Sequence, residues 1–171
     1  MSEPITPADR DVVERQLGRS PRALEGVAHR CPCGQPDVVE TAPRLEDGTP
    51  FPTLYYLTCP RASAAASRLE SAGLMKEWQA ELGTDEELAT GYRAAHERYL
   101  VERDAKDVLP TRATAGGMPD RVKCLHALAA HALAAGPGVN PIGDRAVAGM
   151  GEWWAAGPCA APAPTDPEDV R

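Results

Sequence analysis

The cysteines are the residues of this sequence whose type and spacing could do chemistry. Cys31 and Cys33 stand one residue apart in "HRCPCGQPDVVE", Cys59 lies in "TCP", and Cys124 lies in "MPDRVKCLH". Proline lies next to or near three of them; it removes a backbone donor and stiffens the chain, and Cys-Pro recurs beside iron–sulfur clusters. We therefore predict that Cys31, Cys33, Cys59 and Cys124 hold one metal centre, with a structural or redox-sensing role.

Three interpretations of these four thiols stay open. An iron–sulfur cluster is wider than a single ion and accepts varied ligand spacings, so it is the cofactor that we expect first. Zinc is the alternative cofactor. It ranks second because zinc sites usually draw their ligands from C-x2-4-C knuckles, whereas this chain has a C-x-C pair. In the third interpretation no metal binds, and the cysteines are buried as small hydrophobic side chains.

Cys124 also supports a different class of function, an enzyme with a thiolate nucleophile. Asp120, Arg121 and Lys123 crowd the first turns of a helix predicted for residues 119–135. The helix dipole and the two cations would lower the pKa of the Cys124 thiol. Cys124, Asp120, Arg121 and His126 are therefore the candidate catalytic residues, acting on a small anionic substrate, although no spacing supplies the general base that a nucleophile needs.

The histidines do not complete either site by spacing alone. On a helix Cys124 and His126 would point about 200° apart, so they would not share one ion, and His131 would lie roughly 10 Å along the axis. His29 flanks the "CPC" pair and could bind the metal or donate to a bound sulfur. His96 lies in a charged helix, where we expect it to be solvated.

Length and charge exclude several classes of protein. The 171 residues suffice for one ordinary domain. Eighteen Lys and Arg residues against 25 Asp and Glu residues give a net charge of -7, which is not the basic surface that binds nucleic acid. No apolar run long enough for a membrane span and no export signal are visible, so a cytoplasmic location is expected. In that reducing compartment the five cysteines favour ligands or buried thiols over disulfides.

Helices account for most of the predicted elements. The pattern of caps, prolines and apolar spacing predicts helices at 7–17 with Thr6 as the cap, at 21–27, at 60–71, at 74–82, from Thr84 through about residue 105, and at 119–135. Two Gly- and Pro-rich stretches break this pattern, a linker at 108–119 and a loop at 134–147. The second contains Asn140, Asp144 and Arg145 and ends the preceding helix or forms a pocket wall.

A hairpin gathers three of the thiols. "DVVET" and "TLYYLTC" are β-branched and aromatic runs joined by "APRLEDGTPFP", which contains a turn signal. Antiparallel pairing places the start of one strand beside the end of the other, and so brings Cys31 and Cys33 near Cys59. Cys124 would reach the same place from the last helix.

The expected fold class is α+β, a mostly helical single domain with a small β-hairpin. The domain covers residues 6–150, and residues 151–171 form a disordered, Ala- and Pro-rich acidic tail. Trp153 and Trp154 in "GEWWAAG" either pack back on the domain or await a partner.

Two long strings also resemble a known family. "RCPCGQPDVVETAPRLEDGTPFPTLYYLTCPRA" and "MPDRVKCLHALAAHALAAGPGVNPIGD" are similar to an actinobacterial family called domain of unknown function 501, over about residues 8–147. The resemblance implies a small cytoplasmic protein whose four motif cysteines match Cys31, Cys33, Cys59 and Cys124, whereas Cys159 lies outside the match. Genes near those of the family imply a protein partner in cell division or polyphosphate metabolism.

Overall fold

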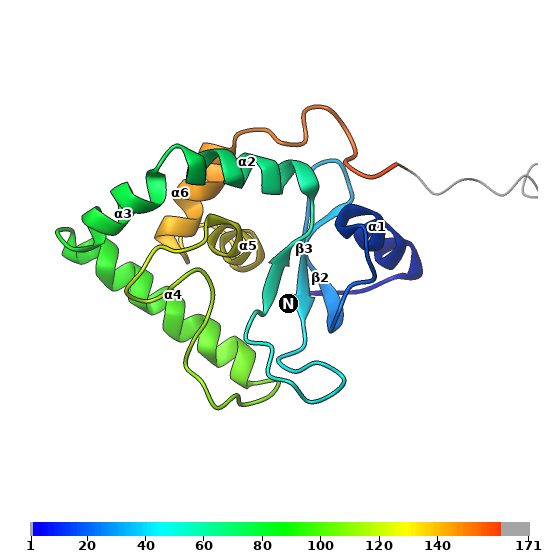
Figure 1. The fold of residues 1–171 in the computed structure, drawn as a ribbon, viewed down its shortest axis with the longest axis horizontal. Coiled ribbons are helices and arrows are strands. Elements are labelled where there is room, and N and C mark those ends of the chain that lie inside the picture. Colours follow the sequence, from blue (N-terminus) through cyan, green and yellow to red (C-terminus); the bar gives the residue numbers. More distant parts are fainter. Residues whose placement is uncertain (1, 162–171) are drawn as a thin grey trace, which may run out of the picture.

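A four-stranded antiparallel sheet forms the centre of the fold. The computed structural model describes residues 2–161, and in it β1 (Glu3–Pro4), β2 (Leu24–Arg30), β3 (Pro36–Thr41) and β4 (Tyr55–Leu57) pair in sequence order. The pairing of β3 with β4 confirms the predicted hairpin. In β3, Val38 and Val39 are both buried, because helices cover both faces of the sheet: α1 lies on one side and α5 on the other (Figure 1).

Six helices complete the α+β fold that the sequence predicts. They are α1 (Pro7–Leu17), α2 (Pro60–Ser71), α3 (Leu74–Leu82), α4 (Glu86–Asp104), α5 (Leu125–Ala135) and α6 (Pro141–Met150). Helices α2 to α6 gather on one side of the sheet, with α5 innermost (Figure 1). Leu125, Leu128 and Ala129 of α5 are fully buried, so this short helix is the core against which the sheet and the other helices pack.

Helix α1 begins as predicted, with a reciprocal cap. The Thr6 hydroxyl accepts a hydrogen bond from the Asp9 amide at 3.1 Å, and the Asp9 carboxylate accepts one from the Thr6 amide at 3.2 Å. Arg30 of β2 also donates to Asp9 at 2.7 Å. This ion pair lowers the pKa of Asp9 to about 2, and it ties α1 to the sheet.

The predicted helix at 21–27 is wrong, because residues 24–30 form β2. Gly26 disfavours a helix interior, and β2 needs that glycine: a Cβ there would lie 2.8 Å from the Glu3 carbonyl oxygen of β1. Val27 is buried between the sheet and the helices. Pairing on both edges, with β1 and β3, therefore outweighs the local Ser-Pro signal.

The last predicted helix starts later, and a further helix follows it. Residues 119–124 precede α5 as irregular chain, so Asp120, Arg121 and Lys123 do not lie in its first turn. The predicted loop at 134–147 contains the start of α6, where the Asn140 side chain accepts from the Gly143 amide at 2.9 Å and Pro141 takes the first helical position. Asn140 is thus a helix cap in the protein core.

The histidines of α4 and α5 are both buried. His96 is 4% exposed and contacts the Thr114 hydroxyl at 3.0 Å, so the expectation that it is solvated is wrong. His131 is fully buried beside the rings of Tyr55 and Tyr99. Its Nδ1 atom lies 3.1 Å from the Asn140 amide nitrogen, which makes that ring nitrogen the acceptor.

The segment after α6 returns to the domain. Trp153 is 8% exposed and packs edge-on against Trp154. This burial favours the interpretation that the two tryptophans pack back on the domain over the one in which they await a partner. Ala160 is buried as well, and the Gln35 side chain donates to its carbonyl at 2.8 Å. Residues 162–171, the rest of the predicted tail, lie outside the described residues.

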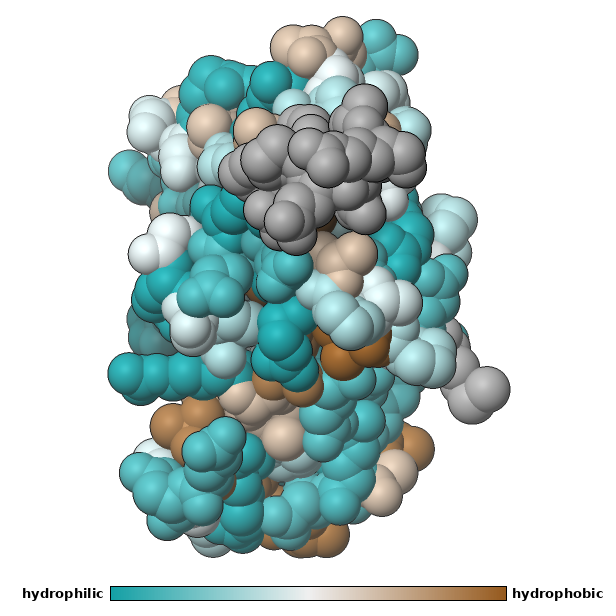
Figure 2. Space-filling view, turned by 90° about the vertical axis from the view of Figure 1, so that its right-hand side faces the viewer, coloured by the Kyte–Doolittle hydropathy of each residue, from teal (hydrophilic) through white to brown (hydrophobic). Residues whose placement is uncertain are grey.

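The surface on the α1 side is mostly hydrophilic. Hydrophobic side chains appear there only in small separate spots (Figure 2). Within residues 2–161, none of the helices combines the length and the hydrophobicity needed to cross a membrane.

Candidate metal centre

Glu70, Cys124 and His126 form the cluster of metal-ligating side chains in the described part of the chain. One ligand atom from each residue, a carboxylate oxygen, a sulfur and a ring nitrogen, lies within 4.8 Å of the other two. Glu70 comes from the last turn of α2, Cys124 precedes α5, and His126 is the second residue of α5. Helix packing therefore joins groups more than fifty residues apart.

The prediction that Cys124 and His126 point about 200° apart is wrong, because their ligand atoms lie within 4.8 Å of each other. It assumed that both residues are helical, but Cys124 is the cap residue of α5, with extended backbone angles of φ -152° and ψ 108°. Because the chain turns from extended to helical at this residue, the helical spacing of 100° per residue does not relate Cys124 to His126. The C-x-H spacing therefore brings a sulfur and a ring nitrogen together at this helix start, and that spacing was the signal available in the sequence.

Hydrogen bonds fix the positions of Glu70 and His126. The Glu70 carboxylate accepts from the Leu125 amide at 2.7 Å and lies 3.2 Å from His126 Nδ1. It thereby satisfies a free amide at the start of α5, where the helix dipole favours negative charge. His126 Nε2 lies 3.1 Å from the Ser63 carbonyl oxygen and 3.2 Å from the Ser67 hydroxyl.

A pocket of about 400 Å³ opens beside Cys124 and His126. Its walls are mostly apolar and come from β4, the residues before it, α2 and α5: Thr53, Tyr55, Tyr56, Leu57, Ser63 and Ala127. No Lys or Arg is among the described residues that line it. Burial raises the pKa of the Tyr55 hydroxyl, and the nearby Glu102 carboxylate adds a smaller rise. The Tyr55 side chain in this wall is therefore uncharged. In the described residues, the walls of this pocket thus carry no Lys or Arg cation that could pair with an anion.

Asp120 and Arg121, the other two candidate catalytic residues, are not among the residues that line this pocket. Their backbone carbonyls hold the irregular chain before α5 in place. Gln79 donates to the Asp120 carbonyl at 3.0 Å, and the Tyr92 hydroxyl donates to the Arg121 carbonyl at 3.0 Å. Both contacts position the segment that leads to Cys124.

None of the other three predicted thiolate ligands joins the Glu70–Cys124–His126 cluster in the described residues. Cys31 and Cys33 are neighbours, since the Cys33 amide faces the Cys31 sulfur at 3.5 Å. Cys59 caps α2, and its side chain lies beside that of Cys159. Burial raises the pKa of both Cys31 and Cys59 to about 12, so both are neutral thiols in the absence of a metal. The binding of one cofactor by Cys31, Cys33, Cys59 and Cys124 stays a prediction.

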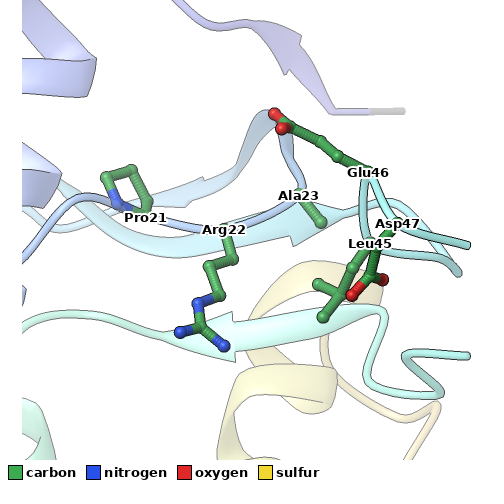
Figure 3. A pocket seen from close by; sticks show the side chains of 6 residues that line it. All are labelled: Pro21, Arg22, Ala23, Leu45, Glu46 and Asp47. Atoms are coloured by element: carbon green, nitrogen blue, oxygen red, sulfur yellow. The ribbon is translucent and has the colours of Figure 1, made fainter. Parts of the chain in front are cut away.

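A second pocket of about 400 Å³ lies between the chain before β2 and the turn at 45–47. Figure 3 shows the Arg22 side chain extending along it and the Glu46 and Asp47 carboxylates at its rim. Arg22 is among the causes that lower the pKa of Asp47, after the hydrogen bonds from Thr49. No cysteine or histidine lines the described part of this hollow, so it lacks the side chains that suit zinc or a thiol reaction.

Comparison with known proteins assigns the chain to a family. Neither a curated protein nor a solved structure matches the chain. A family model described as "Protein of unknown function (DUF501)" matches residues 27–148, which is more than half of the chain and includes Glu70, Cys124 and His126. The chain belongs to the DUF501 family.

Proposed function

We propose that this protein is a metal-binding protein that holds a zinc ion through Glu70, Cys124 and His126. The observation that carries the proposal is the close grouping of the three ligand atoms, all within 4.8 Å. In tetrahedral zinc sites such atoms stand roughly 3.3 to 3.6 Å apart, as follows from Zn–S of about 2.3 Å and Zn–N or Zn–O of about 2.0 Å. Side-chain shifts of about 1 Å would therefore suffice for binding.

The donor set favours zinc over an iron–sulfur cluster at this position. A sulfur, an imidazole nitrogen and a carboxylate oxygen are the three ligand types of zinc proteins, whereas clusters are held mainly by thiolates. Three protein ligands leave a fourth position, and that is the arrangement of zinc sites that act on a bound water. The apolar pocket beside Cys124 would then receive the substrate.

A second candidate function is nucleophilic catalysis by Cys124. It rests on the 3.2 Å contact between His126 Nδ1 and Glu70, which is the contact between a general base and the group that orients it. Cys124 lies within 4.8 Å of both. In this function Glu70 replaces the roles first considered for Asp120 and Arg121.

Zinc titration of three variants tests the proposal. Cys124→Ser, His126→Ala and Glu70→Gln each remove one ligand, and each should weaken zinc binding at this site by at least about tenfold. Glu77→Gln removes an exposed carboxylate of α3 and should leave the affinity unchanged. The affinity is measured by competition with a chromophoric chelator, and the helix content by circular dichroism.

The same variants separate the two functions. Unchanged zinc affinity in all three ligand variants would overturn the metal proposal. If Cys124 is a nucleophile instead, an alkylating reagent should modify it selectively, and His126→Ala should slow that reaction whether or not zinc is present.

A further inference from the structure

Four cysteines that do not belong to the Glu70–Cys124–His126 cluster lie at one end of the sheet. Cys31 and Cys33 lie in the turn before β3, and Cys59 follows β4. Because β3 and β4 are antiparallel, that turn and Cys59 share one end of the sheet, where the Thr58 amide donates to the Asp37 carbonyl at 2.9 Å. The returning C-terminal segment adds Cys159.

Two glutamines fix Cys159 at this place. The Gln35 carbonyl accepts from the Cys31 amide at 3.0 Å, while its side-chain oxygen accepts from the Cys159 amide at 3.1 Å. Gln16 of α1 donates to the Cys159 sulfur at 3.1 Å. The Cys159 thiol thus has a defined position beside Cys59, and it is not part of a free tail.

Backbone groups lie close to two of the sulfurs. The Cys33 amide points at the Cys31 sulfur at 3.5 Å, and Gly34, with φ +88°, allows the tight turn that makes this possible. Cys59 is the residue before the first turn of α2, where the backbone of Ala62 and Arg61 opposes the rise in the pKa of its thiol that burial causes. Amide groups directed at sulfur stabilise a thiolate, which is the form that binds a metal.

Residues that contact these cysteines or lie next to them carry unpartnered polar atoms. Five buried side-chain nitrogen or oxygen atoms in residues 2–161 have no hydrogen-bond partner, and three of the five are Gln16 Oε1, Asp37 Oδ2 and Thr58 Oγ1. Asp37 is fully buried, and only its other oxygen is paired, with His29 Nδ1 at 2.7 Å. Buried polar atoms without partners are rare, and a bound ion with its ordered water is one explanation for them.

We propose that Cys31, Cys33, Cys59 and Cys159 form a second metal site, a four-thiolate zinc site that fastens the C-terminal segment to the sheet. Binding replaces four S–H bonds by four Zn–S bonds and releases four protons, so that no oxidant or reductant is required. Cys159 takes the place that the sequence suggested for Cys124.

The sulfurs must move to bind. They stand as two neighbouring pairs, and no three of these sulfurs in the described chain lie within 4.8 Å of one another. Cys159 lies in chain without regular secondary structure, so the segment around it can shift toward the Cys31–Cys33 turn without breaking a helix or strand. Such a site has no ligand in common with the Glu70 site, so either can exist without the other.

The test uses Cys124→Ser, in which the four cysteines of the proposed site are the only ones left. The full chain is reduced, mixed with zinc and treated with an alkylating reagent, and the modified residues are identified by mass spectrometry. We expect one zinc per chain and slower alkylation of all four thiols. Adding Cys159→Ser should weaken the zinc affinity more than about tenfold.

Two results would overturn the proposal. One is the absence of zinc binding by Cys124→Ser whose circular dichroism and Trp fluorescence match those of the wild type. The other is alkylation of Cys159 at the same rate with and without zinc. Because Cys124 is missing throughout, failure here says nothing against the Glu70–Cys124–His126 site, and the variants of that site say nothing about this one.

Discussion

Acid should destabilise this protein through His131, well above the pH at which carboxylates take up protons. Burial lowers the pKa of His131 from 6.5 to about 4, with nearby Arg98 adding to the effect and Glu102 opposing it. Its Nδ1 accepts from Asn140, so the ring has to be neutral there, and its Nε2 finds no partner in the described chain. Below pH 6.5 the unfolded chain takes up a proton on this histidine, and the folded chain does not until about pH 4.

The size of the effect follows from that difference. Each unit of pKa shift corresponds to about 1.36 kcal/mol. The stability that neutral His131 preserves is fully present above about pH 7 and falls as the pH drops through 6.5 toward about 4. Between about pH 7.5 and about pH 5 the loss is about 2 kcal/mol, and the complete loss, below about pH 4, is about 3 kcal/mol.

This loss of stability is measured by urea unfolding of the wild type and of His131→Gln, each at about pH 7.5 and at about pH 5. Glutamine keeps an acceptor for Asn140 but does not titrate, so the variant should lose about 2 kcal/mol less than the wild type over this interval. His96, whose pKa is also lowered by burial, is present in both proteins, so its effect cancels. An equal loss of stability in the two proteins would refute the reasoning, whatever the absolute stability of the variant.

Two further predictions concern the helices. Asp9→Asn should lower the free energy of unfolding by about 2 kcal/mol at neutral pH, because Arg30 holds the pKa of Asp9 near 2. In urea titrations at acid pH, the difference between the variant and the wild type should vanish as the pH falls from 3.8 to about 2. Gly143→Ala should cost about 1–3 kcal/mol, because its Cβ would lie 2.3 Å from the Leu128 carbonyl oxygen and force α6 away from α5. Gly91→Ala is the control, because the Cβ added there would lie 3.4 Å from its nearest neighbour, an ordinary contact. The melting temperature of this control should stay the same or rise. A fall as large as that of Gly143→Ala would contradict the packing argument.

Local signals were enough for most of the fold. The Thr6 cap, Pro60 and Gly73 mark helix ends that the structure confirms, and the apolar spacing of Leu88, Tyr92 and Tyr99 gives the buried face of α4. These features act within a few residues of one another, so they can be recognised in the sequence. Strand β2 could not, because its stability comes from pairing with strands on both sides.

Helix α6 shows a missed local signal. Asn140 followed by Pro141 is a cap and a first helical residue, but the surrounding glycines favoured the interpretation as a loop. That start signal could have identified the helix.

The site was predictable only in part. Cys124 and His126 were both candidates, but the assumed helix separated them, and Glu70 was not considered at all. Glu70 lies near the end of an Ala- and Ser-rich helix, where its carboxylate looks like any solvated one in the sequence. Its contact with the Leu125 amide depends on the packing of α2 against α5, which no spacing in the sequence encodes. Cys159 was missed for the same reason, since its place depends on side chains from α1 and the turn before β3.

The lengths of the strands bear on how the protein behaves when concentrated. The two inner strands, β2 and β3, have seven and six residues, whereas the edge strands β1 and β4 have two and three. Pro4 removes one amide from β1, and β4 offers only three residues for pairing. Little free backbone is therefore left to which a neighbouring molecule could add a strand, and the sheet resists the edge-to-edge association that leads to aggregation.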